Sequence, residues 1–362
     1  MGKETISSSQ LTTLIVAFLL GSSLLSGSSL VVRSGWVVTA LGTMESVLFA
    51  LVFLTLSERF GHGSFVVASR QACGPVVGAI VSVLFIGFIV QLGGLVLGHF
   101  GFYFNITVLQ QFPTTWFIIP LALASIVCVQ NGVGVMARAA TLLLPASVLS
   151  LFLVLALLLP QAKPANLLPV IDTDWKTLLM ATHGAAVLPL AESAVFMMLL
   201  PHLPRRCRAG RPVLAGIVGG GLLLTLVNFT NVAVLGASIQ NTIFPAHAAA
   251  RLIEVGQVLS RMEILIAINL LSMGFVKMVV LLYGAAEGLT ELLGLHSYKP
   301  LVLPLGSFMV LLAVAGFRDG YAESMVFVAT AWPFYVPFFV LGLPLLVLVT
   351  ALVRGKPGSS AG

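Results

Sequence analysis

Three ionisable side chains lie deep inside apolar stretches that are long enough to cross a membrane: Glu45, Glu192 and Lys277. A charged group at such depth must face protein or a water-filled cavity, and it commonly pairs with an opposite charge. Groups of this kind bind ligands or protons, or they form structural ion pairs. The sequence has no nucleophile–base pair, metal-ligand spacing or phosphate-binding loop, so no enzyme activity, metal or cofactor is predicted.

A proline stands three residues before one of the acids, in the run Leu188-Pro189-Leu190-Ala191-Glu192. Pro189 has no N–H and its ring clashes with the preceding turn, so the helix is expected to open there. Open backbone beside an acid is typical of a discontinuous helix that lines a midplane binding site. All five residues are therefore candidate ligand-binding residues. The alternative is a proline kink beside a carboxyl that is protonated or hydrogen-bonded for packing.

A second interruption lies in the first apolar run, 11–32, which contains two Gly-Ser-Ser triplets beginning at Gly21 and Gly27. Glycine costs about 1 kcal/mol relative to alanine inside a helix, and serine offers the backbone alternative hydrogen bonds. Local unwinding is therefore predicted, with Gly21, Ser22, Ser23 and Gly27 as candidate ligand-binding residues. Close packing of two helices through small residues is an equally good alternative.

The other buried polar residues are candidates for charge pairing or coupling. Glu45 lies nine residues beyond Trp36, or roughly 14 Å into its run, and Lys277 lies fourteen residues beyond Glu263, or roughly 21 Å. Lys277 is too deep to reach the interface and needs a carboxylate or several carbonyls nearby. It could neutralise Glu45 or Glu192, or stand where transporters of related architecture hold sodium. Gln91 is either hydrogen-bonding glue between helices or part of a site.

The composition indicates a membrane protein built from a single transmembrane domain over residues 1–362. Hydrophobic residues make up 59% of the chain and charged residues 8%, whereas soluble domains carry about 25% charge. The net charge of +6 comes without the basic and aromatic patch of a nucleic-acid surface. Cys73, Cys128 and Cys207 show no disulfide or zinc spacing and are expected to be free thiols.

Ten apolar runs are long enough to cross a bilayer, at about 20 residues each. We therefore predict an all-α polytopic fold with two five-helix halves, 11–160 and 178–353. Because five is odd, the halves have opposite orientation, and their first spans are the two interrupted ones, which is the pattern of an inverted-repeat transporter. The ten runs are 11–32, 36–57, 76–104, 114–131, 135–160, 178–201, 211–237, 263–288, 299–317 and 325–353.

Lysine and arginine set the expected orientation, because cytoplasmic loops carry the excess of them. The loop from His202 to Arg211 holds four arginines, and placing it inside puts both termini in the cytoplasm. On the opposite side, the order of apolar, basic and acidic residues from Pro245 to Glu263 predicts an amphipathic helix within 238–262 that lies on the outer surface as a lid.

The chain resembles the endospore germination permease family, the B-subunits of nutrient germinant receptors, within the amino acid/polyamine/organocation superfamily. The resemblance runs nearly end to end and rests on an ordered series of short motifs. These motifs are Gly21-Ser22-Ser23-Leu24-Leu25, Asn131-Gly132 with Arg138, Asn166-Leu167-Leu168-Pro169-Val170, Pro189 to Pro201, Phe244-Pro245, Arg261-Met262-Glu263, Gly274-Phe275-Val276-Lys277 and Tyr298-Lys299-Pro300-Leu301-Val302-Leu303-Pro304-Leu305-Gly306. The chain departs from the motifs of this family at two places, Ser34-Gly35-Trp36 before the second span and Leu188 before the proline.

This resemblance implies a LeuT-like 5+5 inverted repeat with discontinuous helices 1 and 6, in the inner membrane of a spore. It implies a small nutrient, an amino acid above all, bound between those two helices so as to trigger germination. It also implies assembly with an A-type membrane subunit and a C-type lipoprotein. The alternative is a proton-coupled amino-acid transporter of the same fold, in which Glu192 or Glu45 titrates and Lys277 replaces sodium.

Overall fold

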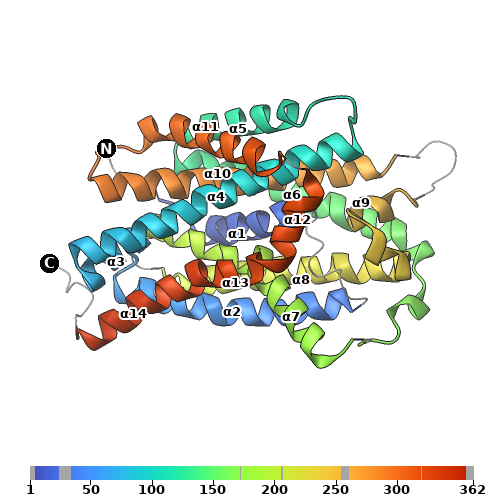
Figure 1. The fold of residues 1–362 in the computed structure, drawn as a ribbon, viewed down its shortest axis with the longest axis horizontal. Coiled ribbons are helices and arrows are strands. Elements are labelled where there is room, and N and C mark those ends of the chain that lie inside the picture. Colours follow the sequence, from blue (N-terminus) through green and yellow to red (C-terminus); the bar gives the residue numbers. More distant parts are fainter. Residues whose placement is uncertain are drawn as a thin grey trace.

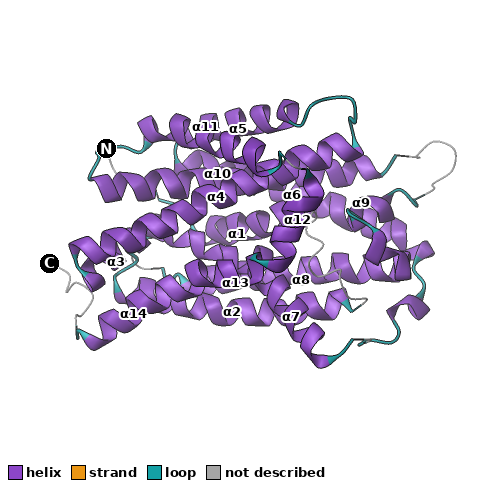
Figure 2. Ribbon diagram, in the orientation of Figure 1, coloured by secondary structure: helices purple, strands orange, loops and turns teal. Residues whose placement is uncertain are grey.

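The computed structural model describes residues 5–23, 34–171, 173–204, 207–253, 261–318 and 320–355. Helices make up almost all of this part of the chain, and Figure 2 shows no strand within it. The α-helices are α1 (Ser8–Ser23), α2 (Gly35–Arg59), α3 (Phe65–Cys73), α4 (Pro75–Thr107), α5 (Thr115–Gln130), α6 (Val133–Leu158), α7 (Trp175–Ala185), α8 (Gly210–Leu235), α9 (Pro245–Ala250), α10 (Glu263–Leu293), α11 (Lys299–Gly316), α12 (Tyr321–Thr330), α13 (Trp332–Pro337) and α14 (Leu343–Val353).

Short helices of other types continue or link these. They are the 3-10 helices η2 (Leu159–Gln161), η3 (Pro164–Leu167), η5 (Ala191–Met198), η6 (Leu200–His202) and η7 (Gly236–Asn241), and the π-helical turns η4 (Ala186–Leu190) and η8 (Phe338–Gly342). Within the described residues, eight helical segments are long and apolar enough to cross a membrane, and α1 and α5 are shorter apolar helices. The number of spans, ten, stays a prediction.

Most helices run side by side along the long axis of the molecule, as Figure 1 shows, with α12 inclined steeply across them. The middle of the bundle is formed by α10, which packs against α1, α4, α5 and α6, while α2 packs against α8 and α7. Most buried apolar side chains of the described residues form one large core, and two small separate clusters lie between α2 and α7 and beside the end of α8. Residues along the outer faces of α2, α4 and α11 are apolar and exposed, as expected of surfaces that meet lipid.

Glycines bring α1 and α8 into close contact. A Cβ atom at Gly216 would lie 2.7 Å from the Ile15 Cβ, and one at Gly220 would lie 2.7 Å from the Leu19 Cδ1. Side chains larger than hydrogen would force these two helices apart. This is the use of small residues that close packing in a membrane favours.

The sixth span, from Trp175 to Met198, is broken at the predicted place. Its first half is α7, and Leu188 then has a non-helical backbone with φ −123° and ψ 113°, directly before Pro189. The second half continues as η5, which contains Glu192. The helix therefore opens where proline removes a backbone donor.

Gly21, Ser22 and Ser23 are still helical and form the last residues of α1, and residues 24–33, over which the predicted interruption would continue, lie outside the described residues. A Cβ atom at Gly21 would lie 2.5 Å from the Met273 carbonyl oxygen and 2.9 Å from the Lys277 Cβ. The glycine thus serves close packing of α1 against α10. Gly27 lies outside the described residues.

Within 238–262 the structure describes η7 and then α9, which ends at Ala250. Ala246, His247, Ala249 and Ala250 of α9 are buried against the bundle. Pro245 starts α9 at a position where its missing N–H costs nothing. Residues 254–260 lie outside the described residues, so the outer amphipathic helix stays a prediction.

Candidate functional site

A buried ion pair lies directly after the break in the sixth span. Lys277 of α10 donates a hydrogen bond to Glu192 Oε2, and both side chains are 0% exposed. The Lys277 ammonium also lies 4.4 Å from the centre of the Phe18 ring of α1, a cation–π contact. Of the two acids considered as partners for Lys277, the structure brings Glu192 to it.

Only one of the two carboxylate oxygens of Glu192 takes part in this pair. Its second oxygen, Oε1, is buried and has no hydrogen-bond partner among the described residues, and the same is true of the neighbouring Ser193 hydroxyl. An unpaired buried oxygen of this kind lacks the compensation that buried polar groups normally find. It is therefore an acceptor ready for a donor that enters the site.

Three elements converge at this ion pair. Gly21 allows α1 to approach α10 at the level of Lys277, and α1 also packs against η4 and η5. The predicted residues Gly21, Glu192 and Lys277 are therefore brought together. Leu188, Pro189, Leu190 and Ala191 are buried within the broken turn beside them.

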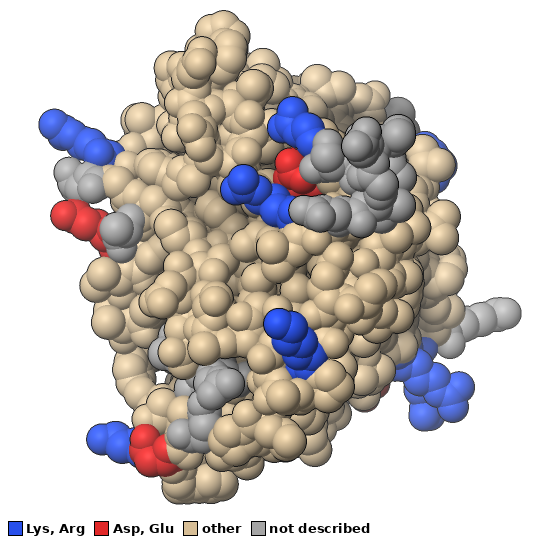
Figure 3. Space-filling view, turned by 90° about the vertical axis from the view of Figure 1, so that its right-hand side faces the viewer, with Lys and Arg blue, Asp and Glu red and all other residues tan. Residues whose placement is uncertain are grey.

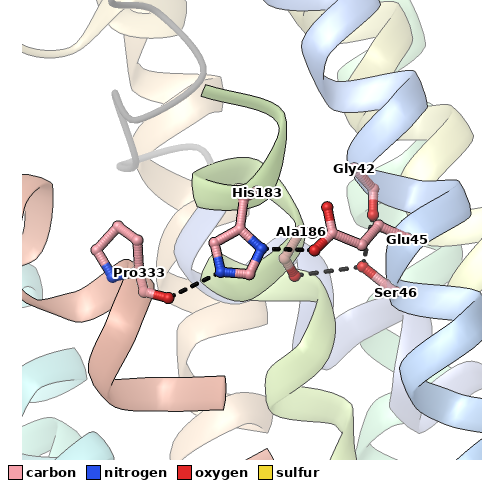
Figure 4. A network of polar contacts seen from close by, with 6 residues as sticks. All are labelled: Gly42, Glu45, Ser46, His183, Ala186 and Pro333. Atoms are coloured by element: carbon pink, nitrogen blue, oxygen red, sulfur yellow. Dashed lines mark hydrogen bonds and ion pairs between the residues drawn. The ribbon is translucent and has the colours of Figure 1, made fainter. Parts of the chain in front are cut away.

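The other mid-membrane acid, Glu45, has a different partner. Its Oε1 lies 2.5 Å from His183 Nδ1, and His183 Nε2 lies 2.9 Å from the Pro333 carbonyl oxygen. Figure 4 shows the imidazole between these two acceptors, so that α2, α7 and α13 meet at one ring. Beside it, the Ser46 hydroxyl donates to the Gly42 oxygen at 2.7 Å and lies 3.2 Å from the Ala186 oxygen, also in Figure 4.

His183 was not among the residues selected from the sequence. The available signal was the polar group Thr182-His183-Gly184, five residues before the proline in an otherwise apolar span. An ionisable residue within a span is a functional candidate by default. The two side chains are partly exposed, 29% for His183 and 25% for Glu45.

Gln91 lies apart from both pairs, on α4, where it accepts a hydrogen bond from the Tyr335 hydroxyl of α13. It also lines a cavity of about 540 Å³ together with Glu323 and Trp332. Gln91 therefore links α4 to the last span, and it is not brought to Lys277.

Charged and metal-ligating side chains are scattered elsewhere. Figure 3 shows lysines, arginines and acids spread singly or in small groups over one end of the molecule, with no single patch. Within the described residues, no three His, Cys, Asp or Glu side chains gather to hold a metal ion. Cys73, Cys128 and Cys207 are free thiols.

The sequence matches a family model described as "Spore germination protein" over residues 5–316. Two proteins of Bacillus subtilis (strain 168) align along nearly their whole length. Spore germination protein KB is 26% identical over 98% of this chain and 97% of its own, and spore germination protein YndE is 22% identical over 97% of each.

Solved structures of transporters share the fold. MhsT in complex with L-phenylalanine superposes with a TM-score of 0.74 at 16% identity, covering 98% of this chain and 91% of its own. Mhp1, a nucleobase-cation-symport-1 family transporter with bromovinylhydantoin bound, gives 0.63 at 15% identity, covering 99% and 95%. These are LeuT-fold proteins, so the predicted fold class, an all-α multi-pass membrane protein of the LeuT type, is confirmed.

Proposed function

The chain belongs to the spore germination protein family, and we propose that it is the B-type subunit of a spore germinant receptor that binds a small nutrient, an amino acid above all. Its family and fold are those of receptors and transporters, not those of enzymes. The proposed site lies between the end of α1 and the broken turn of the sixth span.

The observation that carries this proposal is the non-helical backbone at Leu188, next to the Glu192–Lys277 pair. A broken helix leaves backbone groups without intrahelical partners, and within a bilayer these must be satisfied by protein, water or ligand. Ser46 of α2 approaches one of the carbonyls, that of Ala186. The other groups at the break are suited to a small polar ligand.

The two ends of an amino acid fit the two sides of this site. In this proposal the ligand carboxylate lies on the side of Gly21, Ser22 and Ser23, together with the positive N-terminal end of η5. Glu192 would stay tied to Lys277 through Oε2 and accept the ligand ammonium on Oε1, which has no partner among the described residues. Glu192 then both shapes the pocket and contacts the ligand. Gly27 belongs to the same proposed set.

The cellular setting is part of the proposal and is supported by the names of the two relatives, both spore germination proteins. The protein would lie in the inner membrane of the spore with both termini in the cytoplasm. It would assemble with an A-type membrane subunit and a C-type lipoprotein. Ligand binding would signal only if the ligand had unequal affinity for two conformations of the receptor.

A thermal-shift screen tests this site directly. Purified protein in detergent is heated with individual amino acids and nucleosides, and a ligand at 100 times its Kd should stabilise the native state by about 2.7 kcal/mol. Glu192→Gln should abolish the shift, whereas Glu58→Gln, at an exposed acid of α2, should leave it intact. A full ligand-induced shift in folded Glu192→Gln protein would show that Glu192 is not in the site.

A second candidate is a proton-coupled amino-acid transporter of the same fold. It is favoured by the Glu45–His183 contact, which places a titratable pair in mid-membrane next to the broken span. The two functions separate by flux. Vesicles that contain the protein and accumulate the identified ligand only when a proton gradient is imposed would support transport.

A further inference from the structure

The His183 ring is bound through both of its nitrogens. Nε2 lies 2.9 Å from the Pro333 carbonyl oxygen, and Nδ1 lies 2.5 Å from Glu45 Oε1. A carbonyl oxygen can only accept, so the contact to Pro333 requires a proton on Nε2. Whatever holds Nδ1 to Glu45 must therefore involve a different proton.

That second proton can reside on either partner. If the Glu45 carboxylate is ionised, Nδ1 carries it and the imidazole is a cation; if the carboxyl is protonated, its O–H donates to Nδ1. In both arrangements the pair holds one proton in addition to the one on Nε2. A neutral imidazole facing an ionised Glu45 has only one N–H and can serve only one of its two acceptors.

Loss of that one proton therefore has a mechanical result. Either Nδ1 and the carboxylate repel each other, and α7 loses this polar contact with α2, or the ring keeps Glu45 and gives up Pro333, and α7 loses its polar contact with α13. The contact with Glu45 and the contact with Pro333 exist together only while the proton is bound.

The pair lies close to the broken turn of the sixth span. Glu45 stands in the middle of α2, ten residues from Gly35 and so about 15 Å from that end. Around it, α2 touches the turn that leads into the break, because a Cβ atom at Gly42 would lie 2.9 Å from the Ala186 nitrogen. Both side chains are partly exposed, so neither is sealed in the protein core.

Glu45 is the one charged group within ion-pair distance of His183 among the described residues. Other ionisable groups on the helices packed against α2 and α7 have different partners or lie in terminal turns. They are Glu192 with Lys277, Tyr335 with Gln91, Arg70 and Arg354 with backbone oxygens, Glu58 and Arg59 at the end of α2, Lys176 at the start of α7 and Arg211 at the start of α8.

We propose that Glu45 and His183 form a proton-binding site, and that its single exchangeable proton holds α7 to α2 and to α13 at once. The inference deepens the proposed function and rests on it in one respect: α7 is the half of the sixth span that would move at the nutrient site when the proton leaves. Proton binding itself needs no nutrient.

Distances between spin labels test this on purified full-length protein in nanodiscs without any ligand. With the three native cysteines replaced, labels at exposed Leu48 of α2, Leu179 of α7 and Phe334 of α13 report the two contacts. Between about pH 5 and about pH 8, the range in which histidine titrates, one of the distances Leu48–Leu179 and Leu179–Phe334 should lengthen or broaden.

Glu45→Gln is the decisive variant. A glutamine amide can donate to Nδ1 of a neutral imidazole that keeps Nε2–H on Pro333, so both distances should stay at their low-pH values throughout the range. Constant distances in the wild-type protein, or the same pH-dependent change in Glu45→Gln, would overturn the proposal. Either result leaves nutrient binding, which the thermal-shift screen measures separately, as a distinct question.

Discussion

Lys277 donates a hydrogen bond to Glu192 three residues after the proline that breaks the sixth span. Glu192→Gln leaves the lysine charge buried without its partner, and removing one member of such a pair costs about 3–5 kcal/mol. We expect Lys277→Met in the Glu192→Gln background to restore much of the lost stability, with a coupling energy on the order of 0.5–3 kcal/mol. Unfolding in detergent measures this cycle.

The matched control is the pair Arg261–Glu263, 3.5 Å apart, whose arginine is exposed at the surface and whose glutamate is partly buried. Glu263→Gln should change stability by about 0–1 kcal/mol, as is typical of surface pairs. Additive effects of Glu192→Gln and Lys277→Met would contradict the pairing, since independent sites show no coupling.

Gly21→Ala should separate α1 from α10 at the candidate site. The new methyl group would lie 2.5 Å from the Met273 carbonyl oxygen, and overpacking of this kind costs about 1–3 kcal/mol. Stability should fall, and any ligand-induced thermal shift should shrink with it. Gly219→Ala is the control, because its methyl group would meet only Val16, at 3.7 Å. Equal melting temperatures for Gly21→Ala and wild type would argue against this close contact.

Ser46→Ala should loosen α2 from the turn before the break. Its hydroxyl donates to Gly42 within α2 and also approaches the Ala186 oxygen, and a lost hydrogen bond costs about 0.5–1.5 kcal/mol. Among the described residues, the Ser82 hydroxyl bonds only within its own helix, to Gly78 at 2.7 Å, so Ser82→Ala should cost less. Chemical denaturation of the two variants side by side provides the comparison, and equal losses would mean that the approach to Ala186 contributes nothing.

Stability should fall as the pH drops through the acid side of histidine titration, because of His247. This residue lies on α9, outside the apolar spans, and its Nδ1 lies 3.0 Å from the Tyr103 hydroxyl of α4. Burial lowers the pKa of His247 below its ordinary value of 6.5, an effect that Glu263 opposes and Arg251 reinforces.

The unfolded chain therefore binds this proton more readily than the folded one, so the contribution of His247 is fully present above about pH 6.5 and is lost below it. Melting temperatures from about pH 8 to about pH 5 should fall less steeply in His247→Gln than in wild type. His296→Gln, at an exposed histidine, should keep the wild-type slope. An unchanged slope in His247→Gln would remove His247 as the cause.

Much of this architecture could be predicted from the sequence because membrane-length apolar runs and a proline in one of them follow directly from the cost of unsatisfied backbone in lipid. The same reasoning required a carboxylate or several carbonyls near Lys277. It did not decide whether Glu45 or Glu192 is the acid beside Lys277. The depth of a residue along a helix follows from residue numbers, whereas the rotation of one helix against another depends on packing across the whole bundle.

For that reason, two features could be seen only in the structure. His183 lies in a different span from Glu45, and nothing in the spacing of either span says that α2 and α7 face each other. From the sequence, Gly21 was compatible with local unwinding of the helix and with close packing of two helices. The structure shows α10 packed against it, which favours close packing.

The buried pair of Lys277 and Glu192 also constrains how this sequence can change over generations. A single substitution at either position passes through a form with an uncompensated charge in the protein interior, which is selected against by its cost in stability. The two positions, 85 residues apart in the chain, are therefore expected to be substituted together or to stay unchanged. A descendant that carried an apolar residue at one of them should carry a neutral residue at the other.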